Sequence, residues 1–224
     1  MIKKRYFGLS TVKLLLIVVM SAAVIACGLL SAQKFYEIII SVFSIITIIY
    51  ISEGKIAGCA CGMVYSVAYA AVCFSRQIYG LSVYMILIIL PLYAISLFTW
   101  KKNQNKGAVE VKRLPAVKLI LVLAASFIIY WGIFFLLRAV GSSNIVFDSL
   151  TLVFGISGMT LLSLRYVEQW YFNIASNVSV SVLWVFKSVE SISNLNFLIV
   201  AVIFVVSNVI GLVSWRKMEK NKNV

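Results

Sequence analysis

The chain has 224 residues, 62% of them hydrophobic, and a mean hydropathy of +1.04. Soluble domains are only about half apolar, so this composition excludes a soluble protein and indicates an integral membrane protein. The net charge of +13 could suggest a nucleic-acid partner, but the charges are placed as expected for orientation in a bilayer, so none is expected.

Eight apolar runs are long enough to cross a bilayer, because a hydrocarbon core of about 30 Å needs roughly 20 helical residues. The runs are Val12–Leu30, Tyr36–Ile51, Ile56–Phe74, Leu81–Trp100, Val117–Leu137, Ile145–Leu164, Tyr166–Phe186 and Asn196–Trp215. Their connections are short, which predicts one all-α membrane domain without a sizeable soluble part.

The first run follows three basic residues and ends at Val24-Ile25-Ala26-Cys27, which is similar to a lipoprotein cleavage box. We interpret it as an ordinary first helix, with processing as the alternative.

The four cysteines Cys27, Cys59, Cys61 and Cys73 lie in apolar runs, and the chain has no histidine. Without a zinc-like spacing they are predicted to be packing residues, and no metal or cofactor is expected.

Lysine and arginine are distributed unevenly between alternate loops, sixteen on one side and four on the other. The first side carries Lys3, Lys4, Arg5, Lys13, Lys55, Lys101, Lys102, Lys106, Lys112, Arg113, Lys118, Arg165, Arg216, Lys217, Lys220 and Lys222, and the second carries Lys34, Arg76, Arg138 and Lys187. Cytoplasmic loops are enriched in these residues. The distribution predicts a multi-pass protein of a bacterial inner membrane with both termini in the cytoplasm.

An internal repeat relates the two halves of the chain at an offset of 115 residues. The sequence ISLFTWKK, which ends at Lys102, matches IGLVSWRK, which ends at Lys217. The same offset carries two further apolar runs of the first half onto the second. Two three-helix units in the same orientation need one crossing between them, and Val117–Leu137 supplies it. We therefore predict a 3+1+3 bundle of parallel repeats plus one extra N-terminal helix.

The charged stretch KKNQNKGAVEVKRLP contains the breakers Gly107 and Pro115 and marks the boundary between the halves. The predicted segments are 1–35 (tail and extra helix), 36–102 (first repeat), 103–144 (cytoplasmic loop, linker helix and outer loop), 145–217 (second repeat) and 218–224 (tail). Gly58-x-x-x-Gly62 and Gly155-x-x-Gly158 are expected to permit close helix packing.

The run Tyr166–Phe186 combines an apolar length with a polar face. Trp170, Asn173, Asn177, Ser181 and Trp184 follow at steps of three or four residues, which places them on one side of a helix. Lipid offers an amide no hydrogen-bond partner, so this face must point inward. It could serve as interhelical glue or as a substrate path. Two amides between two indoles favour a binding site for a small molecule with a flat ring.

The chemistry available at mid-depth is neutral and aromatic. Acid–base, covalent and metal catalysis all lack the residues they need, so the protein is not expected to be an enzyme. A proton- or sodium-coupled pump usually carries an ionisable residue inside the membrane, and the sequence predicts none. The other mid-depth residues considered, all uncharged, are Tyr65, Ser66, Tyr69, Tyr84, Met85, Ser176, Ser207 and Asn208. They suit a neutral or delocalised-cation solute.

Several of these residues occur in runs that resemble the PnuC family of bacterial nicotinamide riboside transporters. The runs are Gln77-Ile-Tyr79-Gly80, Leu90-Pro91-Leu92, Trp100-Lys-Lys, Tyr166 to Asn177 and Gly211 to Trp215. The resemblance covers about Tyr36 to Lys217. It implies a 3+1+3 fold like that of SWEET sugar transporters, and facilitated diffusion followed by phosphorylation of the substrate inside the cell.

The resemblance also implies a set of substrate-binding residues. The family pattern Glu-x-Trp-x-x-Trp-x-x-x-Asn is matched by Glu168, Trp170 and Asn177, whereas Asn173 replaces the second Trp. Met85 stands where Asn or Gln is common. Taken together with the polar face and the mid-depth residues above, the expected substrate-binding residues are Trp170, Asn173, Asn177, Tyr65, Tyr69, Met85, Ser181 and Asn208.

The substrate is left open by these departures. Relatives of the family carry thiamine, riboflavin or deoxynucleosides, so nicotinamide riboside is the leading candidate among several. A non-transporting membrane scaffold or sensor is the more distant alternative, and a homo-oligomer is left open.

Overall fold

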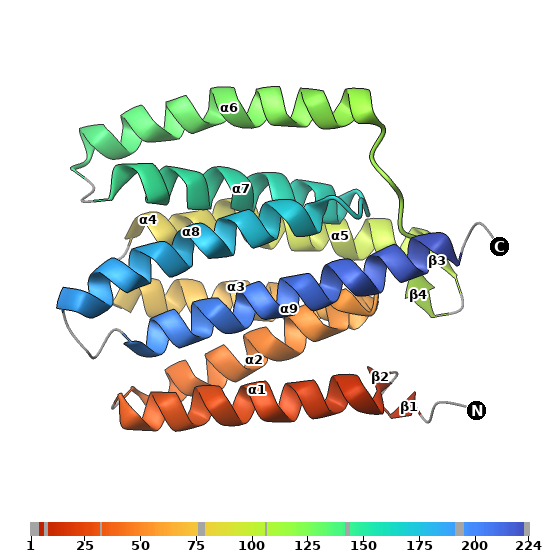
Figure 1. Cartoon of the computed structure of the whole chain (residues 1–224), viewed down its shortest axis with the longest axis horizontal. Coiled ribbons are helices and arrows are strands. Elements are labelled where there is room, and N and C mark those ends of the chain that lie inside the picture. The colour runs from red at the N-terminus through yellow and green to blue at the C-terminus, as the bar shows by residue number, and fades with distance from the viewer. Residues whose placement is uncertain are drawn as a thin grey trace. The chain divides into compact units, whose positions relative to one another are not determined.

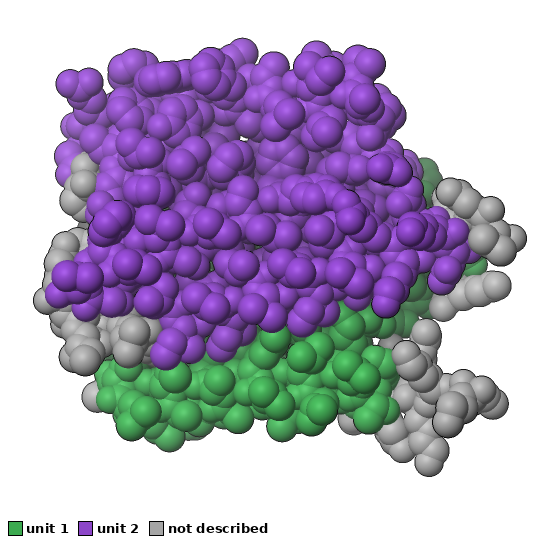
Figure 2. Space-filling model, viewed as in Figure 1, with its two compact units in different colours: residues 1–110 green, residues 111–224 purple. Residues whose placement is uncertain are grey.

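The computed structural model describes the chain except residues 1–4, 7–8, 32, 76–78, 106, 142–143, 191–194 and 222–224. It divides into two compact units, unit 1 (Met1–Glu110) and unit 2 (Val111–Val224), shown in separate colours in Figure 2. Some residues used above lie outside the described part of the chain, namely Lys3, Lys4, Arg76, Gln77, Ile78, Lys106 and Lys222.

Unit 1 is a row of four helical segments, labelled in Figure 1. These are α1 (Thr11–Leu30), α2 (Phe35–Ser52), α3 (Ile56–Ser75) and a segment composed of α4 (Tyr79–Tyr84), η1 (Met85–Ile89) and α5 (Leu90–Lys102). Each segment packs against the next. Two short antiparallel hairpins complete the unit: β1 (Arg5–Tyr6) with β2 (Leu9–Ser10), and β3 (Gln104–Asn105) with β4 (Ala108–Val109).

The extra N-terminal helix α1 is bound to the end of α2 by polar contacts. The backbone N–H of Lys13 donates to the N-cap hydroxyl of Ser10 at 3.4 Å. The Lys13 ammonium is buried, donates to Ser52 Oγ at 3.0 Å and lies 3.5 Å from a carboxylate oxygen of Glu53. Because a buried charge needs a partner, this contact holds the start of α1 against the C-terminal end of α2.

The run predicted as one helix over Leu81–Trp100 is not regular. Residues Met85–Ile89 form a π-helical turn, in which the N–H of Leu90 donates to the carbonyl of Met85. Pro91 follows directly and has no N–H to donate. A widened turn before proline avoids the clash of its ring with the preceding turn. The predicted span is confirmed as one membrane-length helical segment, Leu81–Lys102, and the π-helical turn is a local irregularity within it.

Gly62 brings α3 and α5 into close contact, as the small-residue spacing predicted. A Cβ built on Gly62 would lie 2.4 Å from the ring of Tyr93, which is buried on α5. No side chain larger than hydrogen fits without displacing that ring. The close approach therefore depends on this glycine.

We expect Gly62→Ala to lower the melting temperature of the purified protein, because overpacking a well-packed interior costs about 1–3 kcal/mol. Gly132→Ala is the matched control, since Gly132 is also within a helix but nothing lies within 4 Å of its would-be Cβ. The control should melt at the wild-type temperature or above it. Equal melting temperatures for both variants would contradict the packing assigned to Gly62.

Unit 2 is a second row of four helices: α6 (Ala116–Ala139), α7 (Ile145–Ser163), α8 (Gln169–Glu190) and α9 (Leu195–Lys220). Each again packs against the next, and Figure 1 shows α6 beside α7. Hydroxyl groups join neighbours: Ser126 on α6 and Ser157 on α7 lie 2.8 Å apart, and Ser176 on α8 donates to the Thr151 carbonyl at 2.9 Å. Serines therefore form part of the interhelical hydrogen bonding that was considered for the polar helix.

The polar helix begins later than predicted. Arg165 adopts a positive φ of 68° after α7 and is buried, and residues 166–168 form a turn, so α8 starts at Gln169 rather than Tyr166. The turn pairs with the strand-like segment before α6, where Lys112 N–H donates to the Arg165 carbonyl at 2.8 Å. The N–H of Leu114 donates to Glu168 Oε2 at 2.9 Å. A helix through Tyr166–Glu168 would break these hydrogen bonds.

Seven helices of the described chain are long and apolar enough to cross a membrane, and α8 is not among them. Its 22 residues would extend about 33 Å, and its polar residues explain its lower hydropathy. The all-α, 3+1+3 membrane fold with one added helix is confirmed. The repeated Trp100 and Trp215 lie near the ends of α5 and α9 and are both fully buried.

Candidate functional site

The predicted polar face of α8 is a ladder of hydrogen bonds along the helix. The amide Nδ2 of Asn173 donates to Gln169 Oε1, and that of Asn177 donates to the Asn173 carbonyl at 2.8 Å. Ser181 Oγ donates to the Asn177 carbonyl at 2.8 Å. Each side chain thus directs one donor one turn back. For Asn177, the second N–H and the amide oxygen are not used by any residue that the structure describes.

Asn173 lies in the contact between α8 and α7. A Cβ built on Gly158 would be 2.3 Å from Asn173 Oδ1, so the glycine leaves room for this amide. The Gly158 position predicted for close packing is confirmed. Asn173 therefore has a packing role, whereas Asn177, one turn further along α8, is half-buried and has unused hydrogen-bonding groups.

The ring of Trp170 is tightly packed and does not present an open face. It is 1% exposed, it stands edge to face with Trp215 at 5.7 Å, and a Cβ on Gly211 would lie 2.3 Å from its ring. Its indole N–H is buried and has no hydrogen-bond partner among the described residues. An unpaired buried donor costs about 1–3 kcal/mol, which an acceptor on a bound solute would recover.

Gln169 belongs to the same cluster of polar residues as Asn173 and Trp170, but the sequence analysis did not predict it. Its side chain is fully buried, its oxygen accepts from Asn173, and its Nε2 has no partner in the described part of the chain. The sequence signal was its spacing of four residues from Asn173. Two buried, unpaired donors on adjacent residues of α8 are unusual, because buried polar groups are nearly always hydrogen-bonded.

Asn208 lies on α9, the helix that packs against α8. It is 2% exposed and donates from Nδ2 to the Phe204 carbonyl at 2.7 Å. Like the asparagines of α8, it directs one amide donor to its own helix. Unit 2 therefore contains five of the eight predicted substrate-binding residues: Trp170, Asn173, Asn177, Ser181 and Asn208.

The remaining three predicted residues lie in unit 1. Tyr65 and Tyr69 stack on α3 with their ring centroids 5.5 Å apart and an interplanar angle of 13°. Met85 is buried within the π-helical turn η1, which packs against α3. The structure thus brings a tyrosine pair and a flexible thioether onto neighbouring elements of one unit.

These features define a class of protein. The helices are of membrane length, and away from their terminal turns the polar groups within them are amides, hydroxyls and indoles. No group of three or more His, Cys, Asp or Glu residues able to hold a metal occurs in the described ranges. Such a fold and site are those of a multi-pass membrane transporter for a small solute. The model of the nicotinamide mononucleotide transporter family matches residues 34–217, and the chain belongs to this family.

Two curated relatives and one solved structure agree with this assignment. The nicotinamide riboside transporter PnuC of Neisseria mucosa is 28% identical over 194 residues, which cover 80% of this chain and 71% of that protein. The protein of the same name from Haemophilus influenzae is 24% identical over 198 residues, covering 85% and 83%. A crystal structure of the vitamin B3 transporter PnuC has the same fold, with a TM-score of 0.82, 23% identity and coverage of 96% and 95%.

Membership in a transporter family confirms two predictions from the sequence. The resemblance to PnuC was correct, and the chain is a transporter rather than an enzyme. The individual binding residues are not tested by the comparisons and remain predictions.

Proposed function

We propose that this protein carries a nucleoside-like vitamin across the membrane, with nicotinamide riboside as its leading substrate. The family match over residues 34–217 and the name shared by the two relatives support this proposal. The structural support is the polar ladder of α8, where Asn177 keeps unused hydrogen-bonding groups. Such groups suit the hydroxyls of a ribose or the carboxamide of nicotinamide.

The proposed binding residues of unit 2 are Trp170, Asn173, Asn177, Ser181 and Asn208, to which Gln169 is added. Those proposed in unit 1 are Tyr65, Tyr69 and Met85. The amides would bind polar groups of the solute, and the aromatic rings would contact its heterocycle. A hydrogen bond from the solute would contribute most at the buried N–H groups of Gln169 and Trp170, because these donors have no partner among the described residues.

A second substrate class is supported by the departures at Asn173 and Met85 from the residues common in the family. A thiamine, riboflavin or deoxynucleoside transporter of the same type is therefore the alternative. The test is a panel of labelled nicotinamide riboside, thiamine, riboflavin and deoxynucleosides, measured first for binding to purified protein and then for flux into liposomes. Binding of one vitamin with flux identifies the substrate, whereas no flux of any solute would favour a scaffold or sensor.

We expect transport to run down the substrate gradient without coupling to protons or sodium. All seven carboxylates lie outside the helices or within their terminal turns: Glu37, Glu53, Glu110, Asp148, Glu168, Glu190 and Glu219. Coupled pumps usually place an ionisable group within the membrane. Uptake into cells would then depend on phosphorylation of the solute inside, as the first step towards NAD.

The measurement is flux into liposomes with an imposed pH or sodium gradient. The internal concentration of the solute should level off at the external concentration in either gradient. Accumulation above it would contradict the uniport proposal. A charged solute will still respond to voltage, at about 2.3 kcal/mol per charge for each 100 mV, so the membrane potential must be held at zero.

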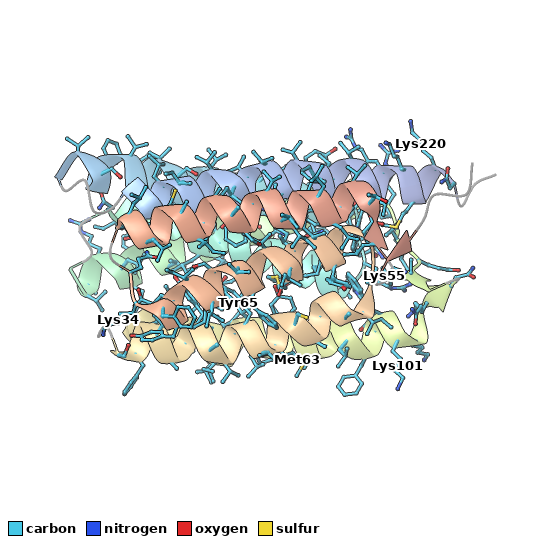
Figure 3. All side chains as sticks on the ribbon, turned by 90° about the horizontal axis from the view of Figure 1, so that it is seen from below. Lys34, Lys55, Met63, Tyr65, Lys101 and Lys220 are labelled. Atoms are coloured by element: carbon cyan, nitrogen blue, oxygen red, sulfur yellow. The ribbon has the colours of Figure 1, made fainter. Side chains whose placement is uncertain are left out.

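We further propose that the protein lies in a bacterial inner membrane with both termini in the cytoplasm. In unit 1, Lys34 lies at one end, and Lys55 and Lys101 lie at the other, with Tyr65 between them (Figure 3). This separation agrees with the uneven loop charges.

Labelling of single cysteines in a cysteine-free background tests the orientation. An impermeant maleimide applied to whole cells should label Val140→Cys and leave Gln104→Cys unlabelled until the membrane is opened, since both residues are exposed. Labelling of Gln104→Cys in intact cells would contradict the orientation.

The predicted segments 1–35, 36–102, 103–144, 145–217 and 218–224 are retained as a proposal for the repeats and their connections. In support, each unit contains one additional helix, α1 or α6, before a set of three. Whether copies of the chain associate would be measured by light scattering of the purified protein.

A further inference from the structure

Unit 2 contains a cavity of about 390 Å³ where α8 begins and α9 ends. It is lined by residues from three parts of the chain: Arg113 before α6, Glu168 and Tyr171 at the start of α8, and Arg216, Lys217 and Lys220 at the end of α9. It is an open cleft, because Arg113, Arg216, Lys217 and Lys220 are exposed, and its volume falls within the range of small-ligand sites, about 300–1,000 Å³. None of these residues is among the predicted substrate-binding residues.

The lining of this cavity is positively charged. Arg113, Arg216, Lys217 and Lys220 are opposed by the two carboxylates Glu168 and Glu219. One oxygen of Glu168 already accepts the backbone N–H of Leu114 at 2.9 Å. No ion pair joins the four cations to these carboxylates in the part of the chain that the structure describes. The cavity therefore has an excess of cationic donors.

Arg216 is held in position by its neighbour on α8. Its guanidinium donates to the Tyr171 hydroxyl and lies 5.5 Å from the centre of the Tyr171 ring. A planar guanidinium fixed in this way can present its remaining N–H groups in pairs, which matches the geometry of phosphate oxygens. A fixed donor also loses less side-chain entropy when an anion binds.

Basic residues at the end of a membrane helix are common, because they orient the protein. The repeat provides a comparison, since Lys101 and Lys102 on α5 correspond to Arg216 and Lys217 at the offset of 115 residues. All four side chains are exposed near the ends of their helices, so exposure does not distinguish the two pairs. Orientation explains both pairs, but it does not explain a cavity lined by basic residues from two distant segments, one of them held by a tyrosine.

We propose that this cavity binds a phosphate-bearing anion. Pockets of this kind at the ends of membrane helices bind lipid headgroups, and the same donors would bind the phosphate of a water-soluble metabolite. The inference concerns a site separate from the transported vitamin and does not depend on which vitamin is carried.

The test compares two charge-neutralising pairs in the full-length protein, purified in a phosphate-free maltoside detergent. One pair is Arg216→Gln with Lys217→Gln, and the matched control is Lys101→Gln with Lys102→Gln. Inorganic phosphate and AMP are titrated by calorimetry, and retained phosphatidylglycerol is counted by native mass spectrometry. Charged hydrogen bonds contribute about 1.5–3 kcal/mol, so the first pair should weaken binding by about tenfold or more, and the control by less than about twofold.

Tyr171→Phe is a second variant that retains every charge and releases Arg216. It should weaken binding by about two- to tenfold, the range expected for one neutral hydrogen bond. Retention of phosphatidylglycerol alone would identify a lipid site, and binding of phosphate or AMP would identify a soluble ligand; either result supports the proposal. Binding of none of the probes, or equal losses in both charge pairs, would overturn it.

Discussion

Asn177→Ala should weaken binding of the transported vitamin by about five- to a hundredfold while the protein still inserts and folds. Removing one partner of a buried hydrogen bond leaves the other unpaired, at a cost of about 1–3 kcal/mol. The Asn177 side chain makes a single hydrogen bond to the described chain, to its own helix at Asn173. The folded state therefore loses little, whereas a bound solute loses an amide donor and acceptor.

The control for this variant is Ser179→Ala. Ser179 is buried on α8 and donates to the Ala175 carbonyl at 3.0 Å, but it does not belong to the predicted face. Its removal should leave binding within about twofold, since own-helix serine bonds of this kind stabilise little. Equilibrium binding of the labelled vitamin panel measures both variants. Equal affinity of Asn177→Ala and wild type for every vitamin would mean that this face is packing glue.

Asn173→Trp should reduce binding of nicotinamide riboside by about fivefold to a hundredfold, although it restores the ring of the family pattern. From the sequence, two outcomes were open, since the indole could fill a depleted pocket or block a reshaped one. In the structure Asn173 Oδ1 already occupies the space beside Gly158, where a Cβ would be only 2.3 Å away. The larger indole would overpack the contact between α7 and α8, which destabilises the folded protein by about 1–3 kcal/mol. It would also remove the hydrogen bond to Gln169.

Val178→Trp is the control for the added indole. Val178 is on α8 and is 46% exposed, so a ring there should change neither melting temperature nor binding by more than a small amount. Fluorescence-detected melting and equilibrium binding are measured on both variants. Tighter binding of nicotinamide riboside to Asn173→Trp would refute the overpacking argument and would show that the pocket only lacks a ring.

Much of the fold could be predicted because hydrophobicity within a bilayer is a local property. A run such as Val117–Leu137 has to be helical, since lipid cannot satisfy a free backbone N–H or C=O, and the structure has α6 at Ala116–Ala139. The 3+1+3 arrangement followed from the repeat and the loop charges. The family followed from short motifs around Trp170 and Trp100.

The boundaries of the polar helix could not be predicted in the same way. Tyr166 and Val167 are apolar enough to continue a helix, but the backbone of Val167 pairs with Lys112. Glu168 accepts the N–H of Leu114. These partners lie more than fifty residues away in the chain, so no local pattern reports them. The π-helical turn at Met85–Ile89 is an intermediate case. Pro91 indicates that the helix is irregular near this point, but it does not specify the form of the irregularity.

For the site, the sequence by itself determined which side chains share the face of α8, because helical spacing is a geometric consequence of residue number. Only the tertiary structure decided how each is used. Gly211 lets α9 approach Trp170 until the ring is buried, Gly158 admits Asn173, and Gln169 is left with an unpaired donor. Burial and unpaired donors depend on which backbones approach one another, and that approach is settled by packing between helices rather than by the sequence of any one of them.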